Sequence, residues 1–463
     1  MEEKTFVDDI NRSVYDIKNE ENDSYRIKQG LTPEIVEKIS EEKHDPAWMR
    51  EFRLKSLEIY NNMQVPDWGP SIDGLNMDNI ATYVRANTNM KGDWNDVPEE
   101  IKDTFDRLGI PKAERESLAG VGAQYDSELV YHNVRKEVAD QGVVYTDMES
   151  ALTGEYADMV HEHFMKLITP QDHKFAALHG AVWSGGSFVY VPKGVNLEIP
   201  LQSYFRLNAA GAGQFEHTLI IVDEGASLHF IEGCSAPKYN VANLHAGAVE
   251  LFVAKNAKLR YSTIENWSKN MYNLNTKRAT VAEGGKIEWV SGSFGSHVSY
   301  LYPMSILNGE RSSCEFTGIT FAGAGQNLDT GMKVVHNAPG TTSVVSTKSI
   351  SKGGGISTFR SAVTMTTKAK KSKSSVSCQS LMIDDISRSD TIPAMDIRVN
   401  DADVGHEATI GRISDDAVFY LMSRGIPEDD ARAMIVSGFA DNVSKELPLE
   451  YAMEMNNLIR LEM

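Results

Sequence analysis

Cysteine is scarce in this chain of 463 residues, and long apolar runs are absent. The three cysteines, Cys234, Cys314 and Cys378, lie far apart and form no Cys-x-x-Cys pair, which argues against a disulfide framework. No apolar run approaches the roughly 20 residues of a membrane-spanning helix. The first ten residues, MEEKTFVDDI, are acidic, whereas a signal peptide is basic and then apolar. We therefore expect a cytoplasmic protein with no membrane partner.

Positive charge is also in short supply. The chain has 46 Lys and Arg against 65 Asp and Glu, which gives a formal net charge of −19. Such a field repels a phosphate backbone, so nucleic acid is not an expected partner. Hydrophobic residues make up 41% of the chain and charged residues 24%, and this length is enough for two or three domains with a substantial core.

Both ends of the chain show helix signals. Thr32-Pro33 and Asp45-Pro46 each place a capping oxygen before a proline at the first helical position, so we expect a mostly helical N-terminal region over residues 1–165. Near the other end, Ser414 precedes a run that begins with acids, and Gly425 stops it. We expect a C-terminal helical domain over residues 404–463.

Between these regions, residues 166–403 consist of short alternating runs typical of strands, such as HTLIIV and KIEWVSGS. Small or polar turn positions precede such runs at intervals of 31, 31, 29, 24, 31 and 31 residues; they are Gly194, Gly225, Asn256, Gly285, Gly309, Gly340 and Lys371. A period near 30 made of turn plus strand predicts a β-solenoid. The alternative, an antiparallel sandwich, should show several hairpin signals, and only Asn308-Gly309 is present.

Each thiol has a structural and a chemical interpretation. Cys378 lies in a predicted strand after the turn KAKKSK, whose lysines could lower its pKa; the alternative is a small buried side chain. Cys234 should lie at a strand end where a partner could reach it, with a packing role as the alternative, and Cys314 should be structural. His406-Glu407 lacks the second histidine of a zinc peptidase, and no phosphate-binding loop is present, so we do not expect the chain to hydrolyse ATP.

An ordered set of motifs resembles one family closely. The motifs are FIEGCSAP, YSTIENW, NTKRA, SKGGG, SCQSLMI and GHEATIGR, and the resemblance covers roughly residues 165–463. Together they are similar to the SufB/SufD family, the scaffold subunits of the SUF iron–sulfur cluster assembly system. The resemblance implies a mainly β fold, a right-handed parallel β-helix core flanked by helical domains. Cys378 favours the SufB branch, because SufD lacks the matching cysteine.

The resemblance also implies functional residues and a transient iron–sulfur cluster. By motif, Cys234 accepts sulfur from a cysteine desulfurase system, and Cys378, with Glu407 and His406, holds the nascent cluster. The implied sulfur route through the β-helix is lined by Arg206, Asn208, Glu216, Trp267 and Lys277. Few thiolates combined with harder ligands suit a temporary site.

The partners implied by the resemblance are a SufC-type ABC ATPase on the C-terminal helices, a second copy or a SufD-type paralogue along the β-helix, and apo iron–sulfur proteins. A flavin is implied by the family alone, since no flavin fingerprint is visible. Two positions depart from the family pattern: Gly405 replaces an acidic residue and Glu265 replaces a glutamine. The segment between Trp267 and Lys277 is also shorter than in some relatives.

We therefore expect an assembly scaffold without enzymatic activity of its own. Within the family, the alternative is a SufD-like structural partner. From another class, β-helices commonly belong to polysaccharide lyases or hydrolases, whose sites need convergent carboxylates. Co-purification with an ABC-type ATPase would separate the scaffold from a lyase.

Overall fold

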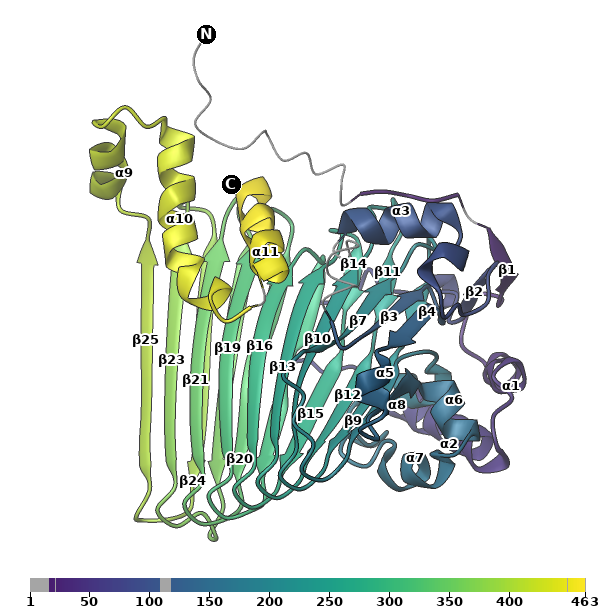
Figure 1. Cartoon of the computed structure of the whole chain (residues 1–463). Coiled ribbons are helices and arrows are strands. Elements are labelled where there is room, and N and C mark those ends of the chain that lie inside the picture. Colours follow the sequence, from purple (N-terminus) through teal and green to yellow (C-terminus); the bar gives the residue numbers. More distant parts are fainter. Residues whose placement is uncertain (1–15, 21, 109–117, 448, 463) are drawn as a thin grey trace.

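The computed structural model describes residues 16–20, 22–108, 118–447 and 449–462, so the acidic first ten residues lie outside it. The chain forms a β-solenoid of about eight turns with helices at both chain ends (Figure 1). Its successive strands pair in parallel. This confirms the predicted solenoid and excludes the antiparallel sandwich.

Two sheets face each other across the lumen of the solenoid. The first sheet has the strand order β25-β23-β21-β19-β16-β13-β10-β7-β3-β4. Its strands, in chain order, are β3 (Gly120–Tyr125), β4 (Glu128–Val134), β7 (Leu201–Arg206), β10 (Ser227–Ser235), β13 (Lys258–Asn266), β16 (Lys286–Phe294), β19 (Ser313–Ala322), β21 (Thr342–Ser351), β23 (Lys373–Met382) and β25 (Asp403–Arg412).

The second sheet changes shape along the solenoid. Each early turn contributes two short strands to this sheet, whereas the later turns contribute one long strand. The change occurs at β20, which pairs with both β17 and β18. Its strands are β5 (Val144–Asp147), β6 (Ser187–Val191), β8 (Gly213–Gln214), β9 (His217–Val222), β11 (Asn243–His245), β12 (Ala248–Val253), β14 (Met271–Asn273), β15 (Thr276–Val281), β17 (Val298–Leu301), β18 (Met304–Leu307), β20 (Asn327–His336), β22 (Ile356–Met365) and β24 (Arg388–Ile397).

Left-handed residues form the corners that set the repeat. They are Gly194, Gly225, Asn256, Gly284, Arg311, Gly340 and Lys371. At the first six of these corners the N–H donates to a carbonyl of the next turn, as from Gly225 to Lys255 over 2.9 Å. Five of the seven predicted positions are these corners. The predicted Gly285 and Gly309 were wrong by one and two residues, because the corners there are Gly284 and Arg311.

Replacing Gly225 with alanine is expected to lower the free energy of unfolding by about 1–2 kcal/mol, the cost of a left-handed conformation for a residue with a Cβ. Gly225 has φ +67°, and an added Cβ would meet no atom within 4 Å. The loss would therefore report backbone strain alone. Urea unfolding measures it. Gly405→Ala, at a strand position with equal space and no positive φ, is the control, and equal effects in the two variants would contradict the assignment.

The N-terminal region contains strands as well as the predicted helices. Strands β3 and β5 join the two solenoid sheets, so the expectation of a mostly helical region missed the start of the core; β1 (Asp23–Arg26) and β2 (Val84–Ala86) form a separate pair. Its helices are α1 (Pro33–Glu42), α2 (Ala47–Asn62), α3 (Glu99–Leu108), α5 (Lys136–Ala139), α6 (Met148–Thr153), α7 (Ala157–His163) and α8 (Lys174–Val182), with short 3₁₀ helices at Met77–Asn79 and Trp94–Asp96.

The two predicted N-terminal caps have different outcomes. Thr32 caps α1 as predicted, accepting the N–H of Ile35. The predicted Asp45 cap was wrong, since α2 begins after Pro46. The Asp45 carboxylate instead accepts the Nε–H of the fully buried Arg53 at 2.6 Å. A buried guanidinium needs a counter-charge, and this need outweighs the cap.

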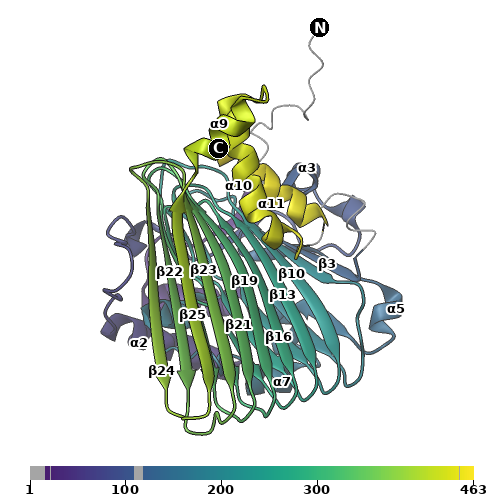
Figure 2. The same cartoon turned by 90° about the vertical axis from the view of Figure 1, so that its left-hand side faces the viewer.

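Three C-terminal helices follow the solenoid: α9 (Asp415–Met422), α10 (Glu428–Ser444) and α11 (Leu449–Glu462). Ser414 caps α9 as predicted. Helices α10 and α11 pack apolar side chains such as Val436 and Ile459 on the outer face of the first sheet, against Ile264 and Ile319 (Figure 2). Helix α9 leaves Phe419 and Tyr420 largely exposed.

Candidate functional site

Cys234 lies at the end of strand β10, as predicted, but its side chain is only 1% exposed. It packs with Phe205 and Trp267 in an apolar cluster. The expectation that a partner could reach this thiol directly is therefore wrong for this conformation. The strand end is covered by the turns that follow β7 and β13.

Charged side chains surround Cys234 inside the lumen. We call Glu216, Glu232, His245, Glu265 and Lys277 the Cys234 cluster. Glu232 Oε1 lies 4.0 Å from the Cys234 Sγ and 3.1 Å from Lys277 Nζ. Lys277 Nζ also lies 3.4 Å from Glu265 Oε1, and His245 Nε2 lies 2.5 Å from Glu216 Oε1. The lumen at this level therefore holds ion pairs cut off from water.

Burial and the charges of the cluster together set the pKa of the Cys234 thiol. Burial raises the pKa of Cys234 well above its usual value, Glu232, Glu216 and Glu265 raise it further, and Lys277 opposes them. Burial alone would lower the pKa of Lys277, but Glu232 and Glu265 outweigh burial and raise it. The resting thiol is thus protonated beside a charged lysine, and Glu232 is the nearest acceptor for its proton.

One departure from the family pattern, Glu265, fits this cluster. The Glu265 carboxylate accepts from Asn273 at 2.6 Å and from Asn275 at 3.1 Å, besides pairing with Lys277. A glutamate therefore has the partners that a buried charge needs. Gly247 makes room for the cluster as well, because a Cβ there would lie 2.2 Å from Glu216 Oε1.

The predicted route residues fall into two groups. Glu216 and Lys277 belong to the Cys234 cluster, and the Trp267 ring lies tilted against the His245 ring, with the ring centroids 4.7 Å apart. Arg206 instead pairs in register with Ser235, not Cys234, so it faces the other side of the sheet. Its Nη1 donates to Ser235 Oγ at 3.1 Å. Asn208 follows it, and its N–H donates to Asp126 at 2.6 Å.

Cys378 lies inside the last turns of the solenoid, 2% exposed, on β23. Its Sγ is 3.7 Å from His406 Nε2 on the terminal strand β25. Glu407 pairs in register with Ser377, so it points to the other face and is exposed. The structure therefore brings Cys378 together with His406 but not with Glu407. Gly405 shares the face of Glu407, where an added side chain would meet open space.

The lysine-rich turn does not activate Cys378. Burial raises the pKa of this thiol, and a hydrogen bond with Thr347 is the influence that lowers it. The turn lysines, such as Lys371 and Lys373, are exposed. That hypothesis was wrong, because the strand carries the thiol inward and away from the turn. Cys314 donates to Ser305 Oγ at 3.3 Å, and burial raises its pKa to about 12, as expected for a structural thiol.

Two adjacent rows of mostly polar residues run along the inner face of the first sheet between the levels of the two thiols. Cys378 ends one row and Cys234 begins the other. Successive register partners give one row of Glu232, Thr263, Ser291, Gly318, Thr347 and Cys378, and a second of Cys234, Glu265, Ser293, Thr320, Ser349 and Ser380. Lys277 donates to Thr263 at one end, and Ser349 to Ser380 at the other.

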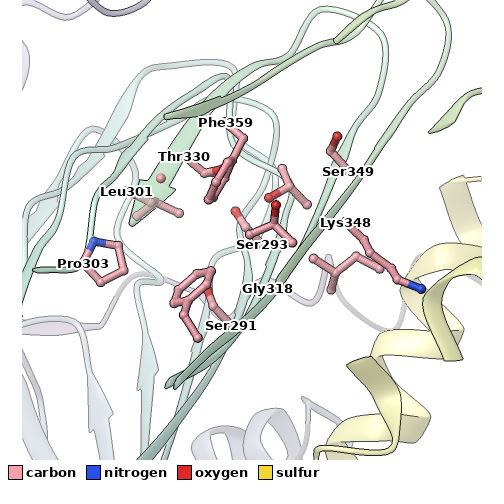
Figure 3. Close-up of a pocket in the computed structure, with 14 residues that line it drawn as sticks. Ser291, Ser293, Leu301, Pro303, Gly318, Thr330, Lys348, Ser349 and Phe359 are labelled. Atoms are coloured by element: carbon pink, nitrogen blue, oxygen red, sulfur yellow. The ribbon is translucent and has the colours of Figure 1, made fainter. Parts of the chain in front are cut away.

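A small cavity lies midway along these rows. It has a volume of about 30 Å³ and is lined by Ser291, Ser293, Gly318, Thr320, Thr347 and Ser349 from the first sheet. Leu301, Thr330 and Phe359 close it from the second sheet, and Lys348 points away from it toward the C-terminal helices (Figure 3). Five strand spacings separate β10 from β23, so the thiols lie about 24 Å apart. Sulfur cannot pass between them by direct contact.

Most of these lumen residues were not identified from the sequence, although they recur at the spacing of the repeat. Stepping back from Cys378 by 31, 29, 27, 28 and 31 residues reaches Thr347, Gly318, Ser291, Thr263 and Glu232. A repeat aligned at its corners would have found both rows. His245 and Asn273 face each other across the same repeat, 28 residues apart and hydrogen-bonded at 2.7 Å.

All three thiols are expected to resist a bulky aromatic disulfide in the folded protein and to react fully in denaturant. They are buried, and burial raises each pKa, so the reactive thiolate is scarce at pH 8. Absorbance of the released thiolate measures the reaction. Fast modification of Cys234 in the native protein would contradict its burial.

Within residues 16–20, 22–108, 118–447 and 449–462, no group of three or more His, Cys, Asp and Glu has the arrangement of a metal site. Of the helices in this part of the chain, none is both long and apolar enough to cross a bilayer.

Comparison with known proteins finds family models and relatives that match nearly the whole chain. The family model described as "SUF system FeS cluster assembly, SufBD core domain" matches residues 205–439, and "SufBD protein N-terminal region" matches residues 36–203. The chain is 50% identical to the "Iron-sulfur cluster assembly protein SufB" of Bacillus subtilis, with 98% of each chain covered. It is 48% identical, with the same coverage, to an "Iron-sulfur cluster assembly SufBD family protein" of Staphylococcus aureus.

Proposed function

Because the chain belongs to the SufB/SufD family of iron–sulfur cluster assembly proteins, we propose that it is the scaffold on which a cluster is built and from which it is transferred. The observation that carries this proposal is the pair of polar rows that join Cys234 to Cys378 inside the lumen. A structural subunit or a polysaccharide lyase has no use for such a connection.

Cys234 is the proposed sulfur acceptor. Once the turns that cover this strand end open, Glu232 takes the thiol proton, and the thiolate attacks the terminal sulfur of a donor persulfide supplied by a cysteine desulfurase system. The S–S bond of the donor breaks, its thiolate leaves, and Cys234 carries the new persulfide. Two thiols of a small reductant then release the sulfur as hydrogen sulfide and become a disulfide, which restores Cys234.

Cys378 and His406 are the proposed first ligands of the nascent cluster. Their 3.7 Å separation places a thiolate and an imidazole side by side, and both are suitable iron ligands. Glu407 lies on the other face of the same terminal strand, so it would reach a cluster that sits at the sheet edge. Iron and sulfide are cargo here, and apo iron–sulfur proteins receive the product.

Two exposed surfaces at the C-terminal end of the solenoid suit the proposed partners. The terminal strands β24 and β25 expose Ile392, Met395 and Ile410, where a second copy or a SufD-type paralogue would pair through the β-helix. Helix α9 exposes Phe419 and Tyr420, where a SufC-type ABC ATPase would dock. ATP hydrolysis is then the partner's activity, and the chain works as a cytoplasmic scaffold without enzymatic activity.

Anaerobic reconstitution tests the proposal. The wild-type chain, with an ABC-type ATPase partner, is expected to take up iron and sulfide and to show thiolate-to-iron absorption bands, and Cys378→Ser is expected to lose most of both. Cys314→Ser is the matched control, since Cys314 lies outside the rows. Equal uptake by wild type and Cys378→Ser would remove Cys378 as a ligand, and no uptake by either would favour a structural subunit.

A further inference from the structure

An extended segment of the chain's own N-terminus lies between the outer side of the first sheet and α3, and we call the residues that contact it from both sides the groove. Residues 16–20 have no regular structure, and in Figure 1 they run beside α3. Arg206 and Asn208, which face away from Cys234, form one wall of the groove, and α3 forms the other. The two polar residues that do not join the Cys234 cluster thus have another task here.

Arg206 and Asn208, the first wall, form hydrogen bonds with the backbone of the segment. The Asn208 amide pairs with both polar groups of one residue, since its Oδ1 accepts the N–H of Asn19 at 3.2 Å and its Nδ2 donates to the Asn19 carbonyl at 3.4 Å. Arg206 Nη2 donates to the carbonyl of Ile17 at 2.7 Å. Contacts at alternate residues are typical of the recognition of an extended peptide.

Helix α3, the second wall, and Tyr125 form hydrogen bonds with the side chain of Asn19. The Asn19 Nδ2, which carries two hydrogens, lies within hydrogen-bond distance of the Tyr125 hydroxyl (2.8 Å), the Thr104 hydroxyl (3.0 Å) and the Glu100 carbonyl (3.2 Å). The Asn19 Oδ1 accepts from the Thr104 hydroxyl at 3.1 Å. An aliphatic side chain could make none of these hydrogen bonds, and a carboxylate could not donate to the Glu100 carbonyl. The groove is therefore selective for asparagine at this position.

The groove residues are anchored independently of the segment. Asp126 accepts the N–H groups of Asn208 and Ala209 at 2.6 and 2.8 Å, and Arg206 also donates to Ser235. The site is therefore pre-organised. Arg206 and Asn208 are 0% and 3% exposed with the segment in place, so its removal would uncover both.

The segment is held by polar contacts. None of residues 16–20 contributes to the hydrophobic clusters that the described residues form, and Lys18 adds only a contact 4.8 Å above the Tyr239 ring. Each such hydrogen bond has a modest net worth because water replaces it on release. The segment can leave without disturbing the core.

We propose that this groove is a peptide-binding site for an extended, asparagine-centred segment, and that residues 16–20 occupy it in the resting protein. Release of the segment breaks its hydrogen bonds with Thr104 and the Glu100 carbonyl of α3, while α3 keeps its own apolar packing on the strands through Phe105. Another peptide of the same chemistry competes for the groove, so docking at this end of the solenoid is controlled by displacement.

Trypsin cleavage after Lys18 in the full chain tests the docking. Asn19→Ala and Asn208→Ala are each expected to speed cleavage at this bond by about tenfold, as expected from the loss of two or more hydrogen bonds. Glu20→Ala, at an exposed neighbour, should leave the rate unchanged. Equal rates in wild type and both Asn variants would overturn the proposal.

Binding of a labelled peptide of residues 13–22 tests the groove itself. By fluorescence anisotropy it should bind the full-length Asn19→Ala chain at least about tenfold more tightly than wild type, because the competing segment is weakened. The same peptide with alanine at position 19 should lose this binding. Failure to bind the Asn19→Ala chain, or equal binding of both peptides, would overturn the proposal. Thermal unfolding confirms that each variant is folded.

Discussion

Replacing Lys277 with methionine is expected to lower the free energy of unfolding by about 3–5 kcal/mol, the usual loss when one partner of a buried ion pair is removed. Lys277 is 4% exposed and lies between Glu232 and Glu265. Methionine keeps most of the volume but leaves two carboxylates in the lumen without their shared cation. Urea unfolding of the two proteins measures the loss.

Two further variants separate charge from packing. Glu265→Gln added to Lys277→Met removes one orphaned carboxylate and should recover part of the lost stability. Lys255→Met breaks an exposed pair with Glu283 and should change stability by about 0–1 kcal/mol. If Lys277→Met cost no more than Lys255→Met, the Cys234 cluster would have to be open to water.

Filling the midway cavity is expected to stop sulfur delivery while leaving the cluster ligands intact. Thr320 lines the cavity at 7% exposure. Leucine at this position adds a branched apolar group to a space of about 30 Å³. Cluster formation from desulfurase-supplied sulfur should fall at least about tenfold. The variant should lose about 1–3 kcal/mol of stability, as overpacked cores do.

The matched control changes chemistry without volume. Thr320→Val removes the hydroxyl and keeps the size, so delivery should persist if free space matters and fall if the hydroxyl matters. Reconstitution with dissolved iron and sulfide should remain normal in Thr320→Leu, since it does not depend on the lumen. Normal desulfurase-driven assembly in Thr320→Leu would mean that sulfur reaches Cys378 from outside.

The fold could be predicted because the corners are chemically distinct. Glycine and asparagine tolerate a left-handed backbone, and they recur at most corners. Arg311 also has a left-handed backbone. An arginine does not indicate this conformation, so the sequence predicts the corner at Gly309 instead. Strand β3 was missed because Gly120 and Gly122 break the apolar alternation. A Cβ at Gly122 would lie 2.6 Å from the Tyr145 hydroxyl.

The site was harder to predict because its residues are far apart in sequence. Register places Cys378 beside residues 31 and 30 positions away, Thr347 and Ala408. The partners of a solenoid residue therefore depend on the length of each turn rather than on local pattern. The alternation along β25 does show from sequence that His406 and Glu407 cannot both face Cys378.

The rows between the thiols also decide which form of sulfur can travel. Beyond the Cys234 cluster the inner face offers serine and threonine hydroxyls and Gly318, with no cation on either row up to Cys378. A hydrosulfide anion leaving Lys277 would exchange an ammonium for neutral dipoles in a narrow, poorly hydrated space, at a large electrostatic cost. Hydrogen sulfide carries no charge and needs only one or two weak hydrogen bonds. On the proposed route, the lumen would therefore favour passage of the neutral acid over its conjugate base.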